Sequence, residues 1–212
     1  MQLDAALSAL SVVTNWPDEE TAAAAAALAG QRTALIAAIG ALGRAASSGT
    51  LKTRVHGDFH LGQVLVSSGD AYIIDFEGEP ARPLKERRAK TSPLRDVAGL
   101  LRSFDYAVAV ASGRAEGTAQ TSPGQATVLN RFADDASGAF LSAYRAGHAE
   151  SPHQWATEAN ERALLDLFLL EKAAYEICYE TANRPDWLGI PVDGLARIAA
   201  RIIALAEDGQ NG

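Results

Sequence analysis

Three polar side chains in the first half of the chain have the types and the spacing needed to handle a phosphate group. Asp58 lies between two histidines in the run His-Gly-Asp-Phe-His, the amide residue Gln63 follows it, and Asp75 ends the next apolar run. Carboxylate and amide oxygens bind Mg²⁺, and bound magnesium neutralises the dense negative charge of the ATP phosphates. The pattern therefore predicts phosphoryl transfer to a hydroxyl group.

The order of these residues matches the order of roles in protein kinases. There an aspartate orients the attacking hydroxyl, a later amide residue holds one magnesium ion, and the aspartate of an Asp-Phe-x tripeptide holds the other. By this correspondence Asp58 is the catalytic residue, and Gln63 and Asp75 are the metal ligands. Either short motif alone would fit a surface turn, so the prediction depends on their combination.

Two short apolar runs are expected to position these residues. Residues 63–66 and 71–75 flank the turn Ser67-Ser68-Gly69-Asp70, which predicts an antiparallel hairpin. Antiparallel pairing brings the start of one strand beside the end of the other. We therefore expect Gln63 and Asp75 at the same end of the hairpin.

The histidines allow a second interpretation of the same loop. Alternating histidine and aspartate can place ligands around one metal ion, so His56, Asp58 and His60 would form a metal-hydrolase site. That alternative leaves Gln63 and Asp75 unexplained. We expect the two histidines to hold the loop by hydrogen bonds and not to act as general base.

A second set of candidate residues lies on a predicted helix over residues 158–183. Spacings of three and four place four of its side chains on one face: Lys172, Tyr175, Glu176 and Tyr179. A stripe of tyrosines by itself is typical of core packing. Interleaved charged residues also suit a sugar, whose CH patches stack on aromatic rings and whose hydroxyls bind carboxylates.

Two longer segments closely resemble bacterial maltokinases. The first runs from Arg54 to Tyr106 and includes Asp75-Phe76-Glu77-Gly78-Glu79-Pro80 and Ser92-Pro93-Leu94-Arg95-Asp96-Val97-Ala98-Gly99; the second runs from Glu171 to Leu188. These enzymes form an aminoglycoside-phosphotransferase-like branch of the kinase fold. They make maltose 1-phosphate from maltose and ATP and are sometimes fused to trehalose synthase.

The resemblance implies a mainly α (α+β) fold, the helical C-terminal lobe of a protein-kinase-like protein with a small β-hairpin that bears the catalytic and metal residues. Residues 1–50 would be a helical linker and residues 51–212 the kinase-like lobe. ATP and Mg²⁺ would be co-substrate and cofactor, and the face with the two tyrosines would bind maltose. Glu77 and Asp96 would support the site, Asp96 either by complementing a helix dipole or by holding the catalytic loop.

The nucleotide-binding part of such a kinase is missing from this sequence. No glycine-rich loop followed by a strand lysine precedes Asp58. We therefore expect the chain to be the C-terminal lobe alone and to be inactive without an N-terminal lobe. Its 212 residues suffice for one core.

The acceptor stays open at this level. Acidic residues near a pocket also suit an ammonium group, so glucosamine is an alternative to maltose. Outside the kinase class, the chain would be a non-catalytic domain that binds a sugar or docks onto trehalose synthase.

Composition sets further expectations. The net charge of −7 argues against a general nucleic-acid binder, which needs a basic face. The single cysteine, Cys178, excludes an internal disulfide. The sequence has neither a signal-peptide pattern nor an apolar run of membrane-spanning length, so we expect a cytoplasmic protein with no membrane partner.

Apolar periodicity predicts the helices that position the candidate residues. They cover residues 3–13, 19–46, 93–112, 127–146, 158–183 and 191–207. Asp18 is the expected N-cap of the second helix, and Ser92 that of the third. We expect a charged, proline-rich loop beside the site at 76–92, a mobile loop at 113–124 and a frayed tail at 209–212.

Overall fold

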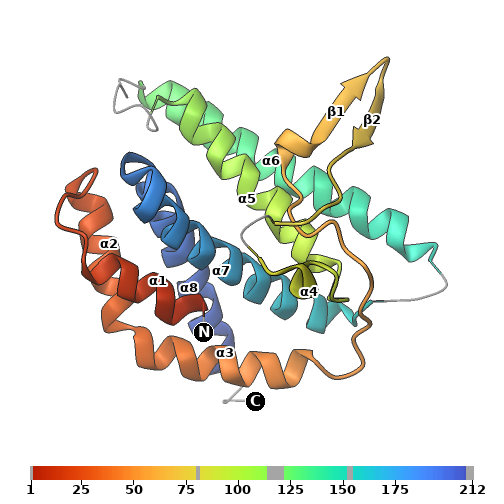
Figure 1. The fold of residues 1–212 in the computed structure, drawn as a ribbon, viewed down its shortest axis with the longest axis horizontal. Helices are drawn as coiled ribbons and strands as arrows, with labels where there is room; N and C mark the ends of the chain where they lie inside the picture. Colours follow the sequence, from red (N-terminus) through yellow and green to blue (C-terminus); the bar gives the residue numbers. More distant parts are fainter. Residues whose placement is uncertain (1, 80–81, 114–121, 152–154, 209–212) are drawn as a thin grey trace.

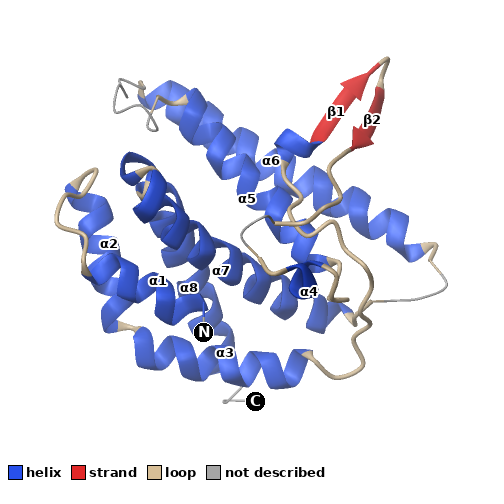
Figure 2. Ribbon diagram, viewed as in Figure 1, coloured by secondary structure: helices blue, strands red, loops and turns tan. Residues whose placement is uncertain are grey.

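The structure is a computed structural model that describes all residues except 1, 80–81, 114–121, 152–154 and 209–212. Its elements in chain order are α1 (Gln2–Ser11), α2 (Glu19–Gly30), α3 (Arg32–Ala46), the 3-10 turn η1 (Leu61–Gln63), β1 (Val64–Ser67), β2 (Asp70–Ile73), α4 (Leu84–Arg87), α5 (Leu94–Ala111), α6 (Pro123–Ala149), α7 (Glu158–Asn183), the 3-10 turn η3 (Pro185–Trp187) and α8 (Gly189–Asp208). The fold is mainly helical with one small antiparallel sheet, as the sequence predicts (Figure 2).

Helix α7 lies at the centre of the helical body. It packs against α1, α3, α5 and α8 (Figure 1). Its Ala173, Ala174 and Ile177 are fully buried and meet Leu195 and Ile202 of α8 in the main core. Small side chains let the helices approach closely, so the polar face of α7 is carried by a rigid, tightly packed element.

The predicted helix over 19–46 is wrong as a single element, because it is bent by 65° into α2 and α3. The break follows Gly30, and glycine is a poor helix former. Both halves contact α8, and the bend places Leu28 and Leu35 in one core. Asp18 caps α2 as expected, since its carboxylate accepts a hydrogen bond from the Thr21 amide at 2.7 Å.

Four other helix starts, those of α1, α5, α6 and α8, differ from the prediction by one to four residues. Helix α5 begins one residue later than expected, with Pro93 in the cap position, although the Ser92 hydroxyl accepts a hydrogen bond from the Leu94 amide. Helix α6 begins earlier, at Pro123, because Ser122 and Gln125 form a reciprocal capping box. Most of the loop expected to be mobile and the tail expected to be frayed lie outside the described residues.

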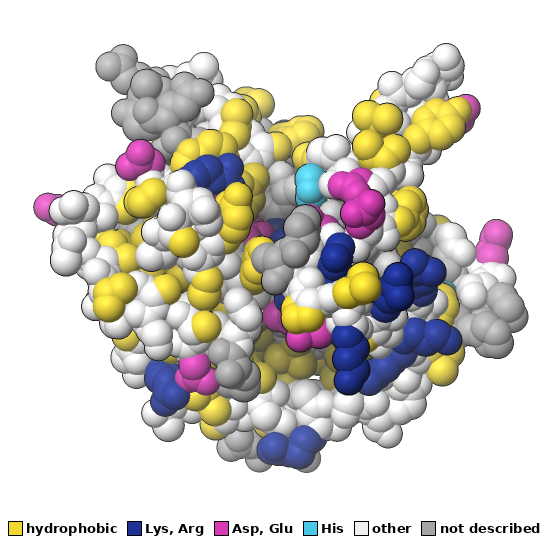
Figure 3. Space-filling model, in the orientation of Figure 1, with side chains coloured by type: hydrophobic (Ala, Val, Ile, Leu, Met, Phe, Trp, Pro, Cys, Tyr) yellow, Lys and Arg dark blue, Asp and Glu magenta, His cyan; other side chains and the backbone are white. Residues whose placement is uncertain are grey.

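The hairpin projects from the helical body (Figure 1). Val64 pairs with Ile73, and the turn carries positive φ angles at Ser68 (53°) and Gly69 (87°), which match the twist of the strands. Apolar side chains are visible on its surface in Figure 3, and Val66 is 77% exposed.

The segment 76–92 contains the short helix α4. Lys and Arg side chains gather over it in Figure 3, and the exposed ones include Lys85, Arg88 and Lys90. Within this segment Arg82 forms a salt bridge to Glu79 at 2.7 Å.

Among the described residues no single helix combines the length and the apolar composition needed to cross a membrane; only α2 and α3, taken together as a bent pair, meet both criteria.

Candidate functional site

The loop that carries Asp58 is held by the first turns of α5. Asp96 accepts hydrogen bonds from the amides of His56 at 2.7 Å and Gly57 at 2.8 Å. A Cβ atom at Gly99 would lie 2.5 Å from the Phe59 carbonyl oxygen, so only glycine allows the loop to approach α5 this closely. Of the two roles considered for Asp96, the structure shows the contact with the loop.

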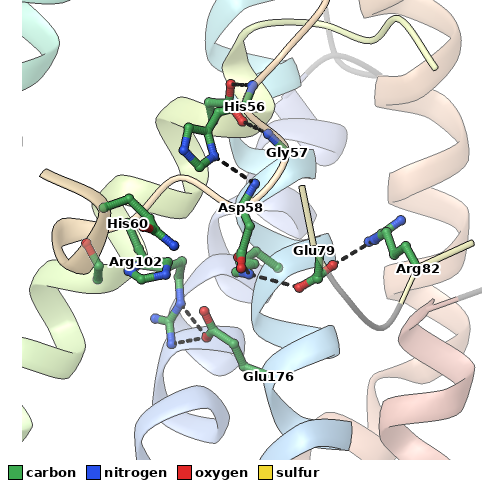
Figure 4. Close-up of polar contacts among 12 residues, drawn as sticks. His56, Gly57, Asp58, His60, Glu79, Arg82, Arg102 and Glu176 are labelled. Atoms are coloured by element: carbon green, nitrogen blue, oxygen red, sulfur yellow. Dashed lines mark hydrogen bonds and ion pairs between the residues drawn. The ribbon is translucent and has the colours of Figure 1, made fainter. Parts of the chain in front are cut away.

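Both histidines of the loop are engaged with backbone groups. His56 Nε2 donates to the Ile74 carbonyl at 2.7 Å. Its Nδ1 accepts from the Asp58 amide at 3.3 Å (Figure 4). His60 Nδ1 accepts from the Gly62 amide at 3.1 Å. Across the described part of the chain, no three His, Cys, Asp or Glu side chains converge as a metal site would require, so the geometry does not support the metal-hydrolase alternative.

The hairpin brings Gln63 and Asp75 together, as its pairing predicts. Gln63 Nε2 donates to Asp75 Oδ2 at 3.1 Å, and the Ile74 amide donates to the Gln63 carbonyl at 3.0 Å. Asp75 has a φ of 63°, a left-handed conformation that aspartate adopts more readily than most residues. An amide and a carboxylate side by side fit the oxygen ligands that Mg²⁺ prefers. Their role as metal ligands stays a prediction.

Glu77 does not join this group. Its side chain is exposed, and its backbone carbonyl accepts a hydrogen bond from Arg87 at 3.2 Å. It therefore contributes to the path of the loop that follows the hairpin.

A cleft of about 560 Å³ runs between the loop that carries Asp58, α5 and α7. Its lining residues are Asp58, His60, Glu79, Gly99, Ser103, Tyr106, Lys172, Tyr175, Glu176, Tyr179, Glu180 and Arg184. All four predicted sugar-binding residues of α7 thus share one cleft with the predicted catalytic aspartate. The tyrosines of this face are not packed into the core.

Lys172 links Asp58 to a carboxylate that the sequence interpretation missed. Its Nζ lies 3.3 Å from Asp58 Oδ1 and 3.2 Å from Glu79 Oε1. Burial would lower the pKa of Lys172, but attraction to Glu79 and Asp58 outweighs it and raises that pKa. No local pattern marks Glu79, because its approach to α7 depends on the path of the loop.

Glu176 is paired inside the protein with Arg102 of α5, a second residue that sequence reasoning missed. Arg102 is 2% exposed and donates from Nε and Nη2 to Glu176 Oε2 at 2.9 and 2.7 Å (Figure 4). Burial would lower the pKa of Arg102, but Glu176 and Asp105 outweigh it and raise that pKa. Arg102 fits beside α8 because residue 194 is glycine. A Cβ atom at this position would lie only 2.1 Å from Arg102 Nη1.

Stacked rings and a guanidinium form the outer part of the cleft. The rings of Tyr175 and Tyr179 stack with centroids 6.5 Å apart, and the Arg184 guanidinium lies over the rings of Tyr179 and Trp187 at 5.5 and 4.3 Å. The buried Glu180 accepts hydrogen bonds from Tyr106 at 3.0 Å and from Arg184 at 2.7 Å. Flat faces beside polar groups are suited to a sugar ring.

Comparisons with known proteins point to one group of enzymes. No family model matches the chain. It is 30% identical over 146 residues to a glucosamine kinase of Streptacidiphilus jiangxiensis, covering 69% of this chain and 31% of that protein. It is 29% identical over 136 residues to a glucosamine kinase of Mycolicibacterium smegmatis, covering 64% of this chain and 32% of that protein.

Solved structures of glucosamine kinase have the same fold. One in complex with glucosamine, ADP and inorganic phosphate matches with a TM-score of 0.72 and 25% identity, over 94% of this chain and 46% of that one. A second crystal form matches with a TM-score of 0.71 over 92% of this chain and 44% of that one. The chain therefore has the helical lobe of a kinase-like fold and spans less than half the length of these relatives.

Proposed function

We propose that this chain is the acceptor-binding and catalytic lobe of an ATP-dependent sugar kinase. The observation that carries the proposal is the single cleft in which Asp58 faces the aromatic and charged side of α7. The matches to glucosamine kinases, in sequence and in fold, support the same class of reaction.

In this proposal each residue has a task that follows from its position. Asp58 orients the acceptor hydroxyl and takes its proton, and the ion pair with Lys172 at 3.3 Å positions the Asp58 carboxylate in the cleft. Gln63 and Asp75 would hold Mg²⁺, which when bound neutralises charge on the transferred phosphate. A separate nucleotide-binding lobe would hold ATP. Residues 1–50 would be the helical linker to that lobe.

Glucosamine is the first candidate acceptor. The matched relatives carry that name, and four carboxylates, Asp58, Glu79, Glu176 and Glu180, line the cleft beside only two cationic side chains, Lys172 and Arg184. The excess of negative charge favours a sugar that bears an ammonium group. The comparisons give no support to the expected maltokinase or to a trehalose synthase fusion.

One observation favours a neutral sugar such as maltose as the second candidate. Each carboxylate in the cleft already has a cationic partner within the protein: Asp58 and Glu79 share Lys172, Glu176 is paired with Arg102, and Glu180 is paired with Arg184. An ammonium group would have to compete with these partners. A neutral sugar needs only their hydrogen-bonding capacity.

The test compares the two acceptors in the full-length protein with MgATP. We expect ADP release with glucosamine, at a kcat/KM at least tenfold above that with maltose, and a loss of more than a hundredfold in Asp58→Asn. Asp70→Asn, at the exposed start of β2, is the matched control. Faster turnover with maltose would favour the second candidate, and equal activity of Asp58→Asn and the parent protein would refute the catalytic assignment.

A further inference from the structure

A groove on another side of α7 has a charge opposite to that of the whole protein. It lies where α5, α6, α7 and α8 meet and has a volume of about 390 Å³. Its lining includes five arginines, Arg102, Arg145, Arg162, Arg197 and Arg201, against two aspartates, Asp105 and Asp166, a net charge of +3. The chain as a whole carries −7. The groove and the cleft have no lining residue in common. They are connected through Arg102 of the groove, which contacts Glu176 of the cleft.

The arginines of the groove are held but not all neutralised. Arg201 pairs with the buried Asp166 at 2.7 Å, and Arg197 pairs with Asp105 at 2.9 Å. No ion pair joins Arg162 to another residue in the described ranges, and Arg145 pairs with Glu161, which lies outside the groove lining. The floor is apolar: Leu101, Leu141, Leu165, Leu169 and Ile198.

We propose that this groove binds a small phosphate ester, such as a phosphorylated sugar, and that its occupancy is transmitted to the acceptor cleft through Asp105 and Arg102. Guanidinium groups bind phosphate oxygens in pairs, and the volume lies in the range of small-molecule sites. The apolar floor favours an ester with an organic body over free inorganic phosphate.

The route to the cleft is a continuous chain of ion pairs. Asp105 Oδ2 accepts from Arg197 Nη2 at 2.9 Å and from Arg102 Nη1 at 2.5 Å, and Arg102 holds Glu176 of the cleft at 2.7 Å. A phosphate on Arg197 competes for that guanidinium and leaves Asp105 to Arg102 alone. The balance of Arg102 between Asp105 and Glu176 is then shifted, and Glu176 moves with it.

At the cleft end of this series of ion pairs, a tryptophan lies close enough to report a change at Arg102. The Arg102 guanidinium lies 5.9 Å from the ring centroid of Tyr106, and that ring stacks on Trp187 with centroids 6.2 Å apart. A change at Arg102 therefore reaches Trp187, whose fluorescence can be read without ATP or an acceptor.

Binding is tested by calorimetry on the protein with glucose 1-phosphate, inorganic phosphate and glucose. We expect glucose 1-phosphate to bind more tightly than inorganic phosphate, and glucose not to bind in the groove. Arg162→Ala should weaken the ester's affinity about tenfold, the value of one charge-assisted contact. This change leaves no buried carboxylate without its partner, so the fold should be retained. Arg131→Ala, in an exposed pair with Asp135 on α6, is the matched control and should change nothing.

Either of two results would overturn the binding proposal: no heat with millimolar glucose 1-phosphate, or equal losses in Arg162→Ala and Arg131→Ala. Inorganic phosphate binding as tightly as the ester would also overturn the assignment to an ester. The ester could also bind in the cleft, as a reaction product. Arg162 does not line the cleft, so Arg162→Ala would leave binding in the cleft unchanged. These measurements need no phosphoryl transfer, so their failure is distinct from failure of the kinase proposal.

Transmission is tested in a Trp16→Phe, Trp155→Phe background, where Trp187 is the remaining tryptophan. Glucose 1-phosphate should shift its emission, and Asp105→Asn should abolish the shift without weakening the ester's binding, because the ester then no longer competes with Asp105 for Arg197. An unchanged emission at saturation would refute transmission, and so would an equal shift in Asp105→Asn.

Discussion

The ammonium group of Lys172 lies 3.3 Å from a carboxylate oxygen of Asp58, although the two residues are 114 positions apart. The same group lies 3.2 Å from Glu79, whose side chain is 5% exposed. One lysine on the central helix thus fixes both the catalytic loop and the segment that follows the hairpin. Four predictions follow from this arrangement and from the packing around it.

Removing this lysine should destabilise the protein by leaving a buried carboxylate with one partner fewer. We expect Lys172→Met to lower the free energy of unfolding by about 2 kcal/mol, measured by urea denaturation. Glu79→Gln combined with Lys172→Met should recover most of that loss, because the buried charge is then gone. Arg131→Ala, which breaks an exposed ion pair, should cost less than about 0.5 kcal/mol. Losses that simply add in the double variant would contradict this account.

Stability should depend on acid pH through Glu79. Burial would raise the pKa of Glu79, but attraction to Lys172 and hydrogen bonds from Arg82 and Lys172 hold it below the ordinary value of 4.5. A lowered pKa in the folded state stabilises the protein above pH 4.5, and this contribution is lost as the pH falls through the folded-state pKa.

The measurement is a comparison of the parent protein with Glu79→Gln. Their difference in unfolding free energy should be constant above about pH 5 and should shrink steadily below about pH 4.5. Other carboxylates titrate in both proteins and cancel in the difference. A difference that stays constant down to pH 2.5 would show that Glu79 does not titrate in this range.

The approach of the catalytic loop to α5 should be intolerant of one added methyl group. In Gly99→Ala the new Cβ would lie 2.5 Å from the Phe59 carbonyl oxygen, so the loop with Asp58 must shift. We expect kcat of the full-length enzyme to fall at least tenfold.

The matched control for that change is Gly138→Ala on α6, where a Cβ atom meets nothing within 4 Å. Alanine is the better helix former, so this variant should be more stable by about 0.5–1 kcal/mol and equally active. Activity that is equal in the two alanine variants would disprove the close contact.

Tyr179 should matter to the acceptor and not to ATP. Its ring stacks on Tyr175 in the cleft and is 44% exposed. Tyr179→Ala in the full-length enzyme should raise the KM for the sugar roughly five- to tenfold and leave that for ATP within twofold, because a stacking contact at the acceptor is removed. Phe132→Ala, an equally exposed aromatic on α6 at 52%, should change neither constant. An unchanged KM for the sugar would return the tyrosines to a purely structural role.

Short-range patterns were sufficient for much of the fold. The cap at Asp18, the turn at Ser68 and Gly69, and the alignment of Gln63 with Asp75 each depend on residues that are close along the chain. Helical periodicity likewise placed Lys172 and Tyr179 on one face of α7. These features could be predicted because backbone geometry alone determines them.

Features that depend on how the helices pack against one another could not be predicted from the sequence. Gly30 signals a weak point but not a 65° bend, which is decided by the fit of Leu28 and Leu35 into the core. Arg102 has the local pattern of any helical arginine.

By itself, then, the sequence determined the mainly helical fold, the hairpin and the candidate catalytic residues, because local spacing carries that information. Only the tertiary structure decided which charges are paired. Arg102 meets Glu176 across 74 positions, and Lys172 meets Asp58 across 114. Such contacts are set by the packing of α5 and the catalytic loop against α7, and for the buried pair of Arg102 and Glu176 an unpaired charge would cost free energy.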